Sequence, residues 1–256
     1  MYPFLFEIGP LKIPSFGVMI MTGFLGSMLV LRRELVRKKM DGVLAESLAV
    51  AAMIGGLAGA KIYFIIEAWT DVWQDPYTYI LTGAGFTFFG GFIGGLIGVL
   101  LVARIRHLPF LPVLDAIGLT LPIGYGIGRI GCQLAGDGDY GTPTDLPWGM
   151  AYPDGVVPTL ERVHPTPVYE MLYSAVTFWI LWKLRVRLQK PGQLFCVYLI
   201  MIGIARFLVE FIRINPAVLF GLSDAQIISV FIMLTGGICL LVMRNTSVVT
   251  NEPSSS

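Results

Sequence analysis

The sequence has few charged residues: they make up 14% of its 256 positions, where soluble domains carry about a quarter. The three cysteines, Cys132, Cys196 and Cys239, form no CxxC pair and no metal-ligand spacing, so we expect neither a metal site nor a cofactor. The formal net charge of +1 gives no field that attracts nucleic acid. The N-terminus, MYPFLFEIGP, lacks a basic segment and a small-residue cleavage site, so no cleavable signal peptide is expected.

Apolar residues dominate the chain instead. They make up 55% of it, and the mean hydropathy is +0.73. A helix needs about 20 apolar residues to cross a bilayer. The sequence therefore predicts an all-α integral membrane protein with seven transmembrane helices, near residues 15–32, 43–67, 86–104, 109–127, 167–184, 193–213 and 223–243. Asp115 and Pro122 interrupt the fourth segment, whereas the glycine-rich stretches 55–59 and 90–95 favour close helix packing in lipid.

Most basic residues lie on one side of these segments, which the positive-inside rule makes cytoplasmic. The N-terminus is then periplasmic and the C-terminus cytoplasmic, and residues 128–166 form a glycine-rich insert in a small periplasmic head region. We expect one seven-span domain over residues 1–246 and a disordered polar tail over 247–256. The cytoplasmic side holds twelve of the eighteen lysines and arginines: Arg32, Arg33, Arg37, Lys38, Lys39, Arg104, Arg106, Lys183, Arg185, Arg187, Lys190 and Arg244.

Four other basic residues, Lys61, Arg129, Arg206 and Arg213, fall within the predicted spans or at their outer ends. A charge at membrane depth is costly unless it is paired or hydrated, so these residues are candidates for function. Arg206, Glu210 and Arg213 have i, i+4 and i+7 spacing and are expected on one helical face. Two interpretations stay open: a structural ion pair at the interface, or an anion site in which Glu210 orients an arginine that binds phosphate or carboxylate.

Arg129 lies in the run GYGIGRIG, whose glycines let backbones approach closely. If Arg129 faces the same cavity as Arg206, the pair suits a phospholipid head group; the alternative is that Arg129 caps helix carbonyls. His164 begins the run HPTPVYE and is a candidate general base. Its structural alternative is a helix-entry residue hydrogen-bonded to Tyr169 or Glu170. Glu170 is expected to pair with an arginine.

The polar run 128–153 is predicted to be irregular, because glycines, aspartates and prolines crowd it. Asp137 and Asp139 in GDGDYG would suit a cation or catalysis, but an ordinary turn is the stronger interpretation, and the run does not match an EF-hand loop. Cys132 has no adjacent histidine, which favours packing over a nucleophilic role.

These motifs, taken in order, resemble the prolipoprotein diacylglyceryl transferase family over nearly the whole chain. The family signature is G-R-x-G-N-F-x-N-G-E-x-x-G-x-P-T-x-x-P-W-G. The residues that match it are Gly128, Arg129, Gly131, Gly136, Gly141, Pro143, Thr144, Pro147, Trp148 and Gly149. Further matching pieces are IGP at 8–10, GGFIGG at 90–95, HPTPVYE at 164–170 and ARFLVEFIR at 205–213.

The resemblance implies a multi-pass enzyme of the bacterial inner membrane, with seven spans and an active site open to the periplasm. Its activity would be transfer of the diacylglyceryl group of phosphatidylglycerol to the lipobox cysteine of a prolipoprotein, with release of glycerol phosphate. The expected catalytic residues are Arg129, Arg206, His164 and Glu210. The expected phosphatidylglycerol-binding residues are Arg129, Arg206, Arg213, Gly90, Gly91 and Glu170.

The chain departs from the family at positions that bear on proton transfer. Phe89 stands where proteobacterial members have a histidine, so that candidate base is absent, and Phe16 stands where they have a tyrosine. Cys132 and Ala135 replace the asparagines of the signature, and the GDGD run makes the insert one residue longer. His164, Asp137 and Asp139 all remain candidate acceptors of the thiol proton.

Two rival functional classes are weighed against the transferase. A phospholipid or solute transporter would use similar intramembrane charges, but it would be expected to show internal repeats, and none is apparent. An intramembrane protease would need a serine–histidine pair, and Ser15, Ser47 and Ser174 lie in no G-x-S-x-G setting.

Overall fold

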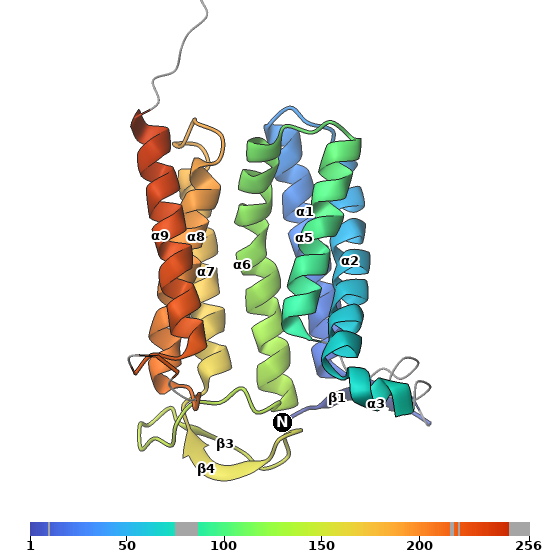
Figure 1. The fold of residues 1–256 in the computed structure, drawn as a ribbon. Coiled ribbons are helices and arrows are strands. Elements are labelled where there is room, and N and C mark those ends of the chain that lie inside the picture. The colour runs from blue at the N-terminus through green and yellow to red at the C-terminus, as the bar shows by residue number, and fades with distance from the viewer. Residues whose placement is uncertain (10, 75–86, 216–217, 220, 246–256) are drawn as a thin grey trace, which may run out of the picture. The chain divides into compact units, whose positions relative to one another are not determined.

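Helices make up most of the chain. The computed structural model describes residues 1–9, 11–74, 87–215, 218–219 and 221–245. Its helices, drawn in Figure 1, are α1 (Ser15–Arg37), α2 (Leu44–Glu67), α3 (Trp69–Gln74), α5 (Phe88–Ile105), α6 (Phe110–Ala135), α7 (Thr166–Leu184), α8 (Gln193–Val209), the 3-10 helix η1 (Glu210–Ile212) and α9 (Asp224–Asn245). The expectation of a mainly helical membrane protein is confirmed. The predicted tail, 247–256, lies outside the described residues.

Five helical segments are long and apolar enough to cross a membrane: Ser15–Arg37, Leu44–Glu67, Phe110–Ala135, Gln193–Ile212 and Asp224–Met243. A shorter apolar helix covers Gly90–Ile105. The two remaining predicted spans, 86–104 and 167–184, coincide with α5 and α7, which are helical but not among the five. The count of seven spans therefore stays a prediction.

Contacts divide the chain into two units, the first made of Met1–Ser27 with Leu114–Ser256 and the second of Met28–Val113. In the second unit, α2 and α5 pack closely through glycines. A methyl group at Gly59 would lie 2.8 Å from the Cα of Gly94, and one at Gly94 would overlap the carbonyl oxygen of Gly55. The predicted close packing of stretches 55–59 and 90–95 is confirmed.

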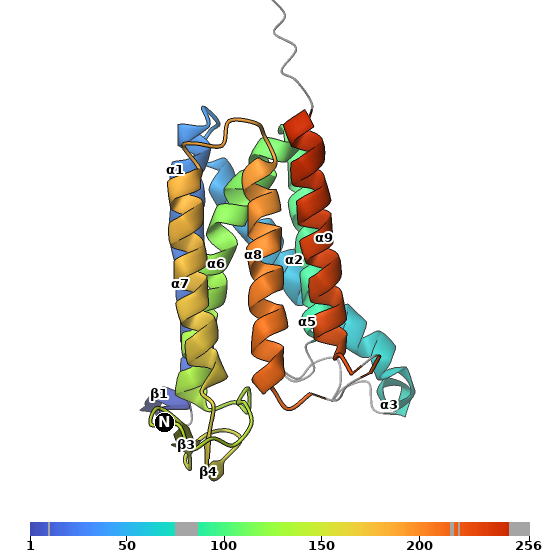
Figure 2. The same ribbon diagram turned by 90° about the vertical axis from the view of Figure 1, so that its left-hand side faces the viewer.

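In the first unit, α7, α8 and α9 lie side by side in chain order, as Figure 2 shows. Helix α6 approaches α7 at Gly126, where an added methyl would lie 3.1 Å from the Cβ of Ser174. Asp115 of α6 reaches the start of α8, where its carboxylate accepts hydrogen bonds from the backbone N–H groups of Gly192 (2.9 Å) and Phe195 (3.0 Å). A carboxylate at this end of a helix satisfies free N–H groups and complements the helix dipole.

The polar run 128–153 is not irregular from its beginning, so that prediction is wrong in part. Helix α6 continues to Ala135 and ends at Gly136, whose φ of +62° is the left-handed conformation in which helices often end. The glycines before that point serve packing: a methyl at Gly131 would lie 3.0 Å from the Cβ of Met19 in α1.

Two small antiparallel hairpins accompany the helices and were not predicted. One pairs β1 (Phe4–Ile8) with β2 (Leu11–Pro14), and the other pairs β3 (Met150–Tyr152) with β4 (Thr159–Val163). Tyr152 is fully buried and stacks on Tyr140 with ring centroids 4.0 Å apart. Burial raises the pKa of Tyr140 to about 12. The second hairpin thus has a small core of its own at the end of the bundle where α6 ends and α7 begins (Figure 1).

Candidate functional site

Three arginines and three carboxylates converge in the first unit, so their formal charges balance. They come from four parts of the chain. Arg129 lies near the end of α6, Asp139 follows that helix, Glu170 lies in the second turn of α7, and the last group spans the end of α8 and η1. That last group contains Arg206, Glu210 and Arg213.

Glu170 is the centre of this cluster and is buried, with 6% of its surface exposed. Its Oε2 lies 2.8 Å from Nε of Arg129 and 3.9 Å from Nη1 of Arg213. Its Oε1 lies 3.3 Å from Nη1 of Arg206 and accepts a hydrogen bond of 2.7 Å from the Tyr125 hydroxyl. The expected pairing of Glu170 with an arginine is confirmed, and it involves three arginines.

Asp139 holds two of the same arginines. One of its carboxylate oxygens pairs with Arg129 and the other with Arg213. Burial alone would raise the pKa of Asp139, but the two guanidinium groups outweigh it and lower the pKa below its ordinary value. The Thr166 hydroxyl at the start of α7 donates to the Asp139 carbonyl oxygen, which fixes this loop against the helix.

Glu210 holds Arg206 from the other side. Its Oε2 lies 3.1 Å from Nη2 of Arg206, and its Oε1 accepts hydrogen bonds from the Ser223 hydroxyl (2.8 Å) and the Asn215 amide. The predicted pairing of Glu210 with an arginine is confirmed. Arg206 keeps 30% of its side chain exposed, which makes it the most accessible of the three guanidinium groups.

Arg213 does not lie on the same helical face as Arg206 and Glu210, so that expectation is wrong. Helix α8 ends at Val209, η1 follows, and Arg213 has an extended backbone with φ −84° and ψ 155°. This turn sends Arg213 towards Asp139. Its Nη1 is buried and has no hydrogen-bond partner among the described residues.

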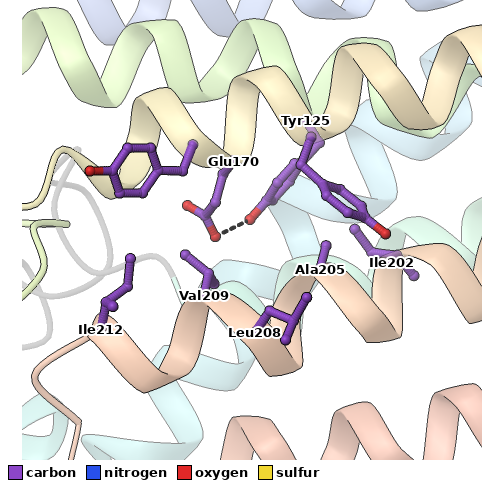
Figure 3. Close-up of a pocket in the computed structure, with 9 residues that line it drawn as sticks. Tyr125, Glu170, Ile202, Ala205, Leu208, Val209 and Ile212 are labelled. Atoms are coloured by element: carbon purple, nitrogen blue, oxygen red, sulfur yellow. Dashed lines mark hydrogen bonds between the residues drawn. The ribbon is translucent and has the colours of Figure 1, made fainter.

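A pocket of about 230 Å³ adjoins the cluster. Figure 3 shows Glu170 and Tyr125 turned towards apolar residues of α8. The lining residues are Tyr125, Tyr169, Glu170, Tyr173, Ile202, Ala205, Leu208, Val209 and Ile212. A cavity with apolar walls and a few convergent polar groups is the usual form of a small-molecule site.

His164 lies beside the pocket rather than within the ion-pair cluster. Its Nδ1 lies 3.2 Å from the hydroxyl of Tyr169. The same hydroxyl accepts a hydrogen bond of 2.8 Å from Nε1 of Trp148. Of the two partners expected for His164, the structure shows Tyr169. The backbone carbonyl of His164 accepts from the N–H of Gly141, so the residue also anchors the insert.

The two predicted glycines lie elsewhere in the chain. Gly90 and Gly91 are on α5 in the second unit, where a methyl at Gly90 would overlap the carbonyl oxygen of Gly59. Helix packing accounts for Gly90, and a lipid-binding role for either glycine stays a prediction. The side chain of Phe89 lies outside the described residues.

Neither the ion pairs of Asp139 nor any role for Tyr125 was predicted from the sequence. Asp139 was interpreted as part of a turn. It follows the helix that carries Arg129 by one glycine-rich turn, and this position is the signal that could have identified it as a partner of that arginine. Tyr125 was not considered, yet it precedes Arg129 by four residues, the spacing at which helical side chains meet. The Arg129 guanidinium lies 4.9 Å from the centre of the Tyr125 ring, and its Nη2 donates a hydrogen bond of 3.0 Å to the hydroxyl.

Cys132 is buried and its Sγ lies 3.7 Å from Nη1 of Arg129. Ligand atoms of Cys132, Asp137 and Asp139 come within 4.8 Å of one another, a grouping of the kind that holds metal ions. Both carboxylate oxygens of Asp139 are paired with arginines, however, so a metal ion would have to compete with two guanidinium groups for this ligand.

Comparison with known proteins identifies a family and several relatives. The model of the family described as prolipoprotein diacylglyceryl transferase matches residues 3–243. A phosphatidylglycerol–prolipoprotein diacylglyceryl transferase of Clostridium tetani is 34% identical over 239 residues, covering 92% of this chain and 95% of the relative. A protein of Leptospira interrogans with the same name is 30% identical, with 89% and 88% covered. A Clostridium perfringens relative, named as the second such transferase, is 35% identical, with 91% and 92% covered.

Proposed function

The chain belongs to the prolipoprotein diacylglyceryl transferase family, and from this premise we propose that it transfers the diacylglyceryl group of phosphatidylglycerol to the thiol of a prolipoprotein cysteine. The thiol belongs to the lipobox of the prolipoprotein signal peptide. The product is a thioether, and glycerol phosphate leaves.

The observation that carries this proposal is the arrangement of three guanidinium groups beside an apolar pocket between helices. Arg206 is partly exposed and shares its two Nη atoms between Glu170 and Glu210. Arg213 has a buried Nη1 without a hydrogen-bond partner among the described residues. An arriving phosphate can therefore reach Arg206, while Arg213 keeps one unused donor in the same cluster, and guanidinium is the side-chain group best suited to phosphate oxygens.

The same arrangement suits the chemistry of the transfer. A thiolate attacks the glycerol carbon, the carbon–oxygen bond to phosphate breaks, and negative charge grows on the phosphate. Preorganised donors that meet charge as it develops lower the barrier more than groups that must first reorient. Arg129, which Glu170 holds, and Arg206, which Glu210 holds, would meet this charge.

We also propose that the enzyme is a multi-pass protein of the bacterial inner membrane with seven spans. Helices α5 and α7 would be the sixth and seventh spans, in addition to the five long apolar helices. The N-terminus and the β3–β4 hairpin would then face the periplasm, where prolipoproteins present their lipobox. The excess of basic residues at the opposite helix ends supports this orientation.

The test uses purified full-length protein in vesicles that contain phosphatidylglycerol, with a lipobox peptide as acceptor. Mass spectrometry should show a diacylglyceryl mass gain on the cysteine and glycerol phosphate in solution. The Arg129→Ala and Arg206→Ala variants should give no product while keeping the helix content of wild type, which circular dichroism measures. Lipid movement or peptide cleavage without a mass gain on cysteine would reject the transferase.

A further inference from the structure

The transfer needs a group that accepts the proton of the attacking thiol. A free thiol has a pKa of about 8.5, so most of it is protonated at neutral pH. Among the described residues that line the pocket, Glu170 is the one with a carboxylate, and it touches Tyr125. Both residues face the pocket in Figure 3, where a dashed line joins them.

We propose that Tyr125 and Glu170 accept the thiol proton together, with Tyr125 as the group that touches the thiol and Glu170 as the final acceptor. This inference rests on the proposed function and adds a proton route to it. It assigns a catalytic role to Tyr125, and it places the base on α7 rather than at His164 or in the GDGD turn.

The two oxygens of Glu170 are held differently. Oε2 is tied to Arg129 at 2.8 Å and has Arg213 at 3.9 Å. Oε1 has its shortest contact with the neutral Tyr125 hydroxyl, at 2.7 Å, and lies 3.3 Å from Arg206. The proton-accepting oxygen is therefore Oε1, since the cation that lies near it among the described residues, Arg206, is also the most accessible of the three arginines.

Substrate binding changes the charges around this oxygen. The formal charges of the cluster balance in the structure, so an added phosphodiester leaves the cluster one negative charge in excess. As the Arg206 Nη1 turns from Glu170 to the phosphate, Oε1 keeps its hydrogen bond from the Tyr125 hydroxyl. A proton that arrives from the thiol restores the charge balance of the cluster.

The geometry at Tyr125 allows the proton to pass. Its oxygen donates to Glu170 and accepts from Nη2 of Arg129, which leaves one lone pair for the thiol. The thiol proton moves to the Tyr125 oxygen while the Tyr125 proton moves to Oε1 of Glu170. The thiolate forms the carbon–sulfur bond, the carbon–oxygen bond breaks, and the phosphate monoester leaves. Glu170 then returns its proton to that phosphate, so no other reactant is consumed.

The experiment compares a cysteine lipobox peptide with a selenocysteine peptide of the same sequence. A selenol is ionised at neutral pH, so it needs no proton acceptor. Tyr125→Phe keeps the ring beside Arg129 and removes only the hydroxyl. With the cysteine peptide its kcat should fall by about a hundredfold or more, the usual contribution of general base catalysis. With the selenocysteine peptide its kcat should match wild type, and the KM for phosphatidylglycerol should not change.

Two controls separate this role from others. Tyr198→Phe removes a phenol hydroxyl on α8 from a residue that is not among those lining the pocket, and it should leave both rates unchanged. Arg206→Lys should lower the transfer rate with both peptides, since it weakens phosphate binding rather than proton transfer. An equal fall in kcat with both peptides in Tyr125→Phe would overturn the proton route. An unchanged kcat with the cysteine peptide would overturn it as well. A wild-type protein that modifies neither peptide would instead reject the proposed function.

Discussion

At the scale of single residues, Asp139 illustrates how a local pattern can hide a long-range role. The run GDGDYG predicts a turn, and the backbone does turn there, with Gly136 and Gly138 at positive φ. The turn itself brings the Asp139 carboxylate between Arg129 and Arg213, which lie 10 and 74 positions away in the sequence. Spacing rules detect neighbours on one helix, whereas a contact of this kind depends on how α6, α7 and α8 meet.

The pH dependence of stability should report on Asp139. Because its pKa is lowered in the folded state, its ion pairs stabilise the protein above the ordinary aspartate pKa, about 3.9, and this contribution is lost as the pH falls through the lower folded value. We expect Asp139→Asn to lower the unfolding temperature at pH 5 to 7, and the difference from wild type to shrink below about pH 4. Thermal unfolding in detergent between pH 3 and 7 measures this.

The matched control for that series is Asp154→Asn, since Asp154 is an exposed residue between β3 and β4. It should follow the wild-type curve throughout. A constant difference between Asp139→Asn and wild type from pH 3 to 7 would show that the loss comes from packing rather than from the charge of Asp139.

At the scale of elements, glycine has two effects that the sequence alone does not separate. In α2 and α5 it removes side chains from a contact surface, so the two backbones meet at Gly55, Gly59, Gly90 and Gly94. In α6 the span that was predicted to end at 127 continues to Ala135, and neighbouring helices pack over Gly126 and Gly131. Only Gly136, with its positive φ, ends the helix.

A single methyl group should distinguish packing glycines from free ones. Gly94→Ala places a Cβ against the carbonyl oxygen of Gly55 and 2.8 Å from the Cα of Gly59. Overpacking of this kind costs about 1–3 kcal/mol, so the unfolding temperature should fall. Gly237→Ala on α9 is the control, since nothing lies within 4 Å of the added Cβ. Alanine is the better helix former by about 1 kcal/mol, so this variant should be as stable as wild type or more. Equal losses in both variants would contradict the packing role.

At the scale of the whole molecule, the predicted spans match the seven long helices of the described residues to within a few residues, except at the far ends of α1 and α6, whereas the short helix α3 was not predicted. The spans could be predicted because a helix that crosses the bilayer needs a run of about 20 mostly apolar residues. The site was harder to predict. Arg129, Glu170, Arg206 and Glu210 were recognised because charges in apolar helices are costly. Tyr125 was missed because a tyrosine in an apolar run carries no such signal, and the two hairpins were missed because they are short.

Membrane orientation is the largest-scale prediction that the sequence makes, and two exposed positions test it. In a Cys239→Ser background, which leaves the buried Cys132 and Cys196, we introduce Asp154→Cys between β3 and β4 or Gln189→Cys between α7 and α8. A membrane-impermeant maleimide added to intact spheroplasts should label Asp154→Cys, because the hairpin lies outside. Gln189→Cys, among the basic residues Arg187 and Lys190, should react only after the membrane is opened. The reverse pattern would place the arginine cluster on the cytoplasmic side and contradict the orientation, and labelling of both positions in intact spheroplasts would contradict a crossing between them.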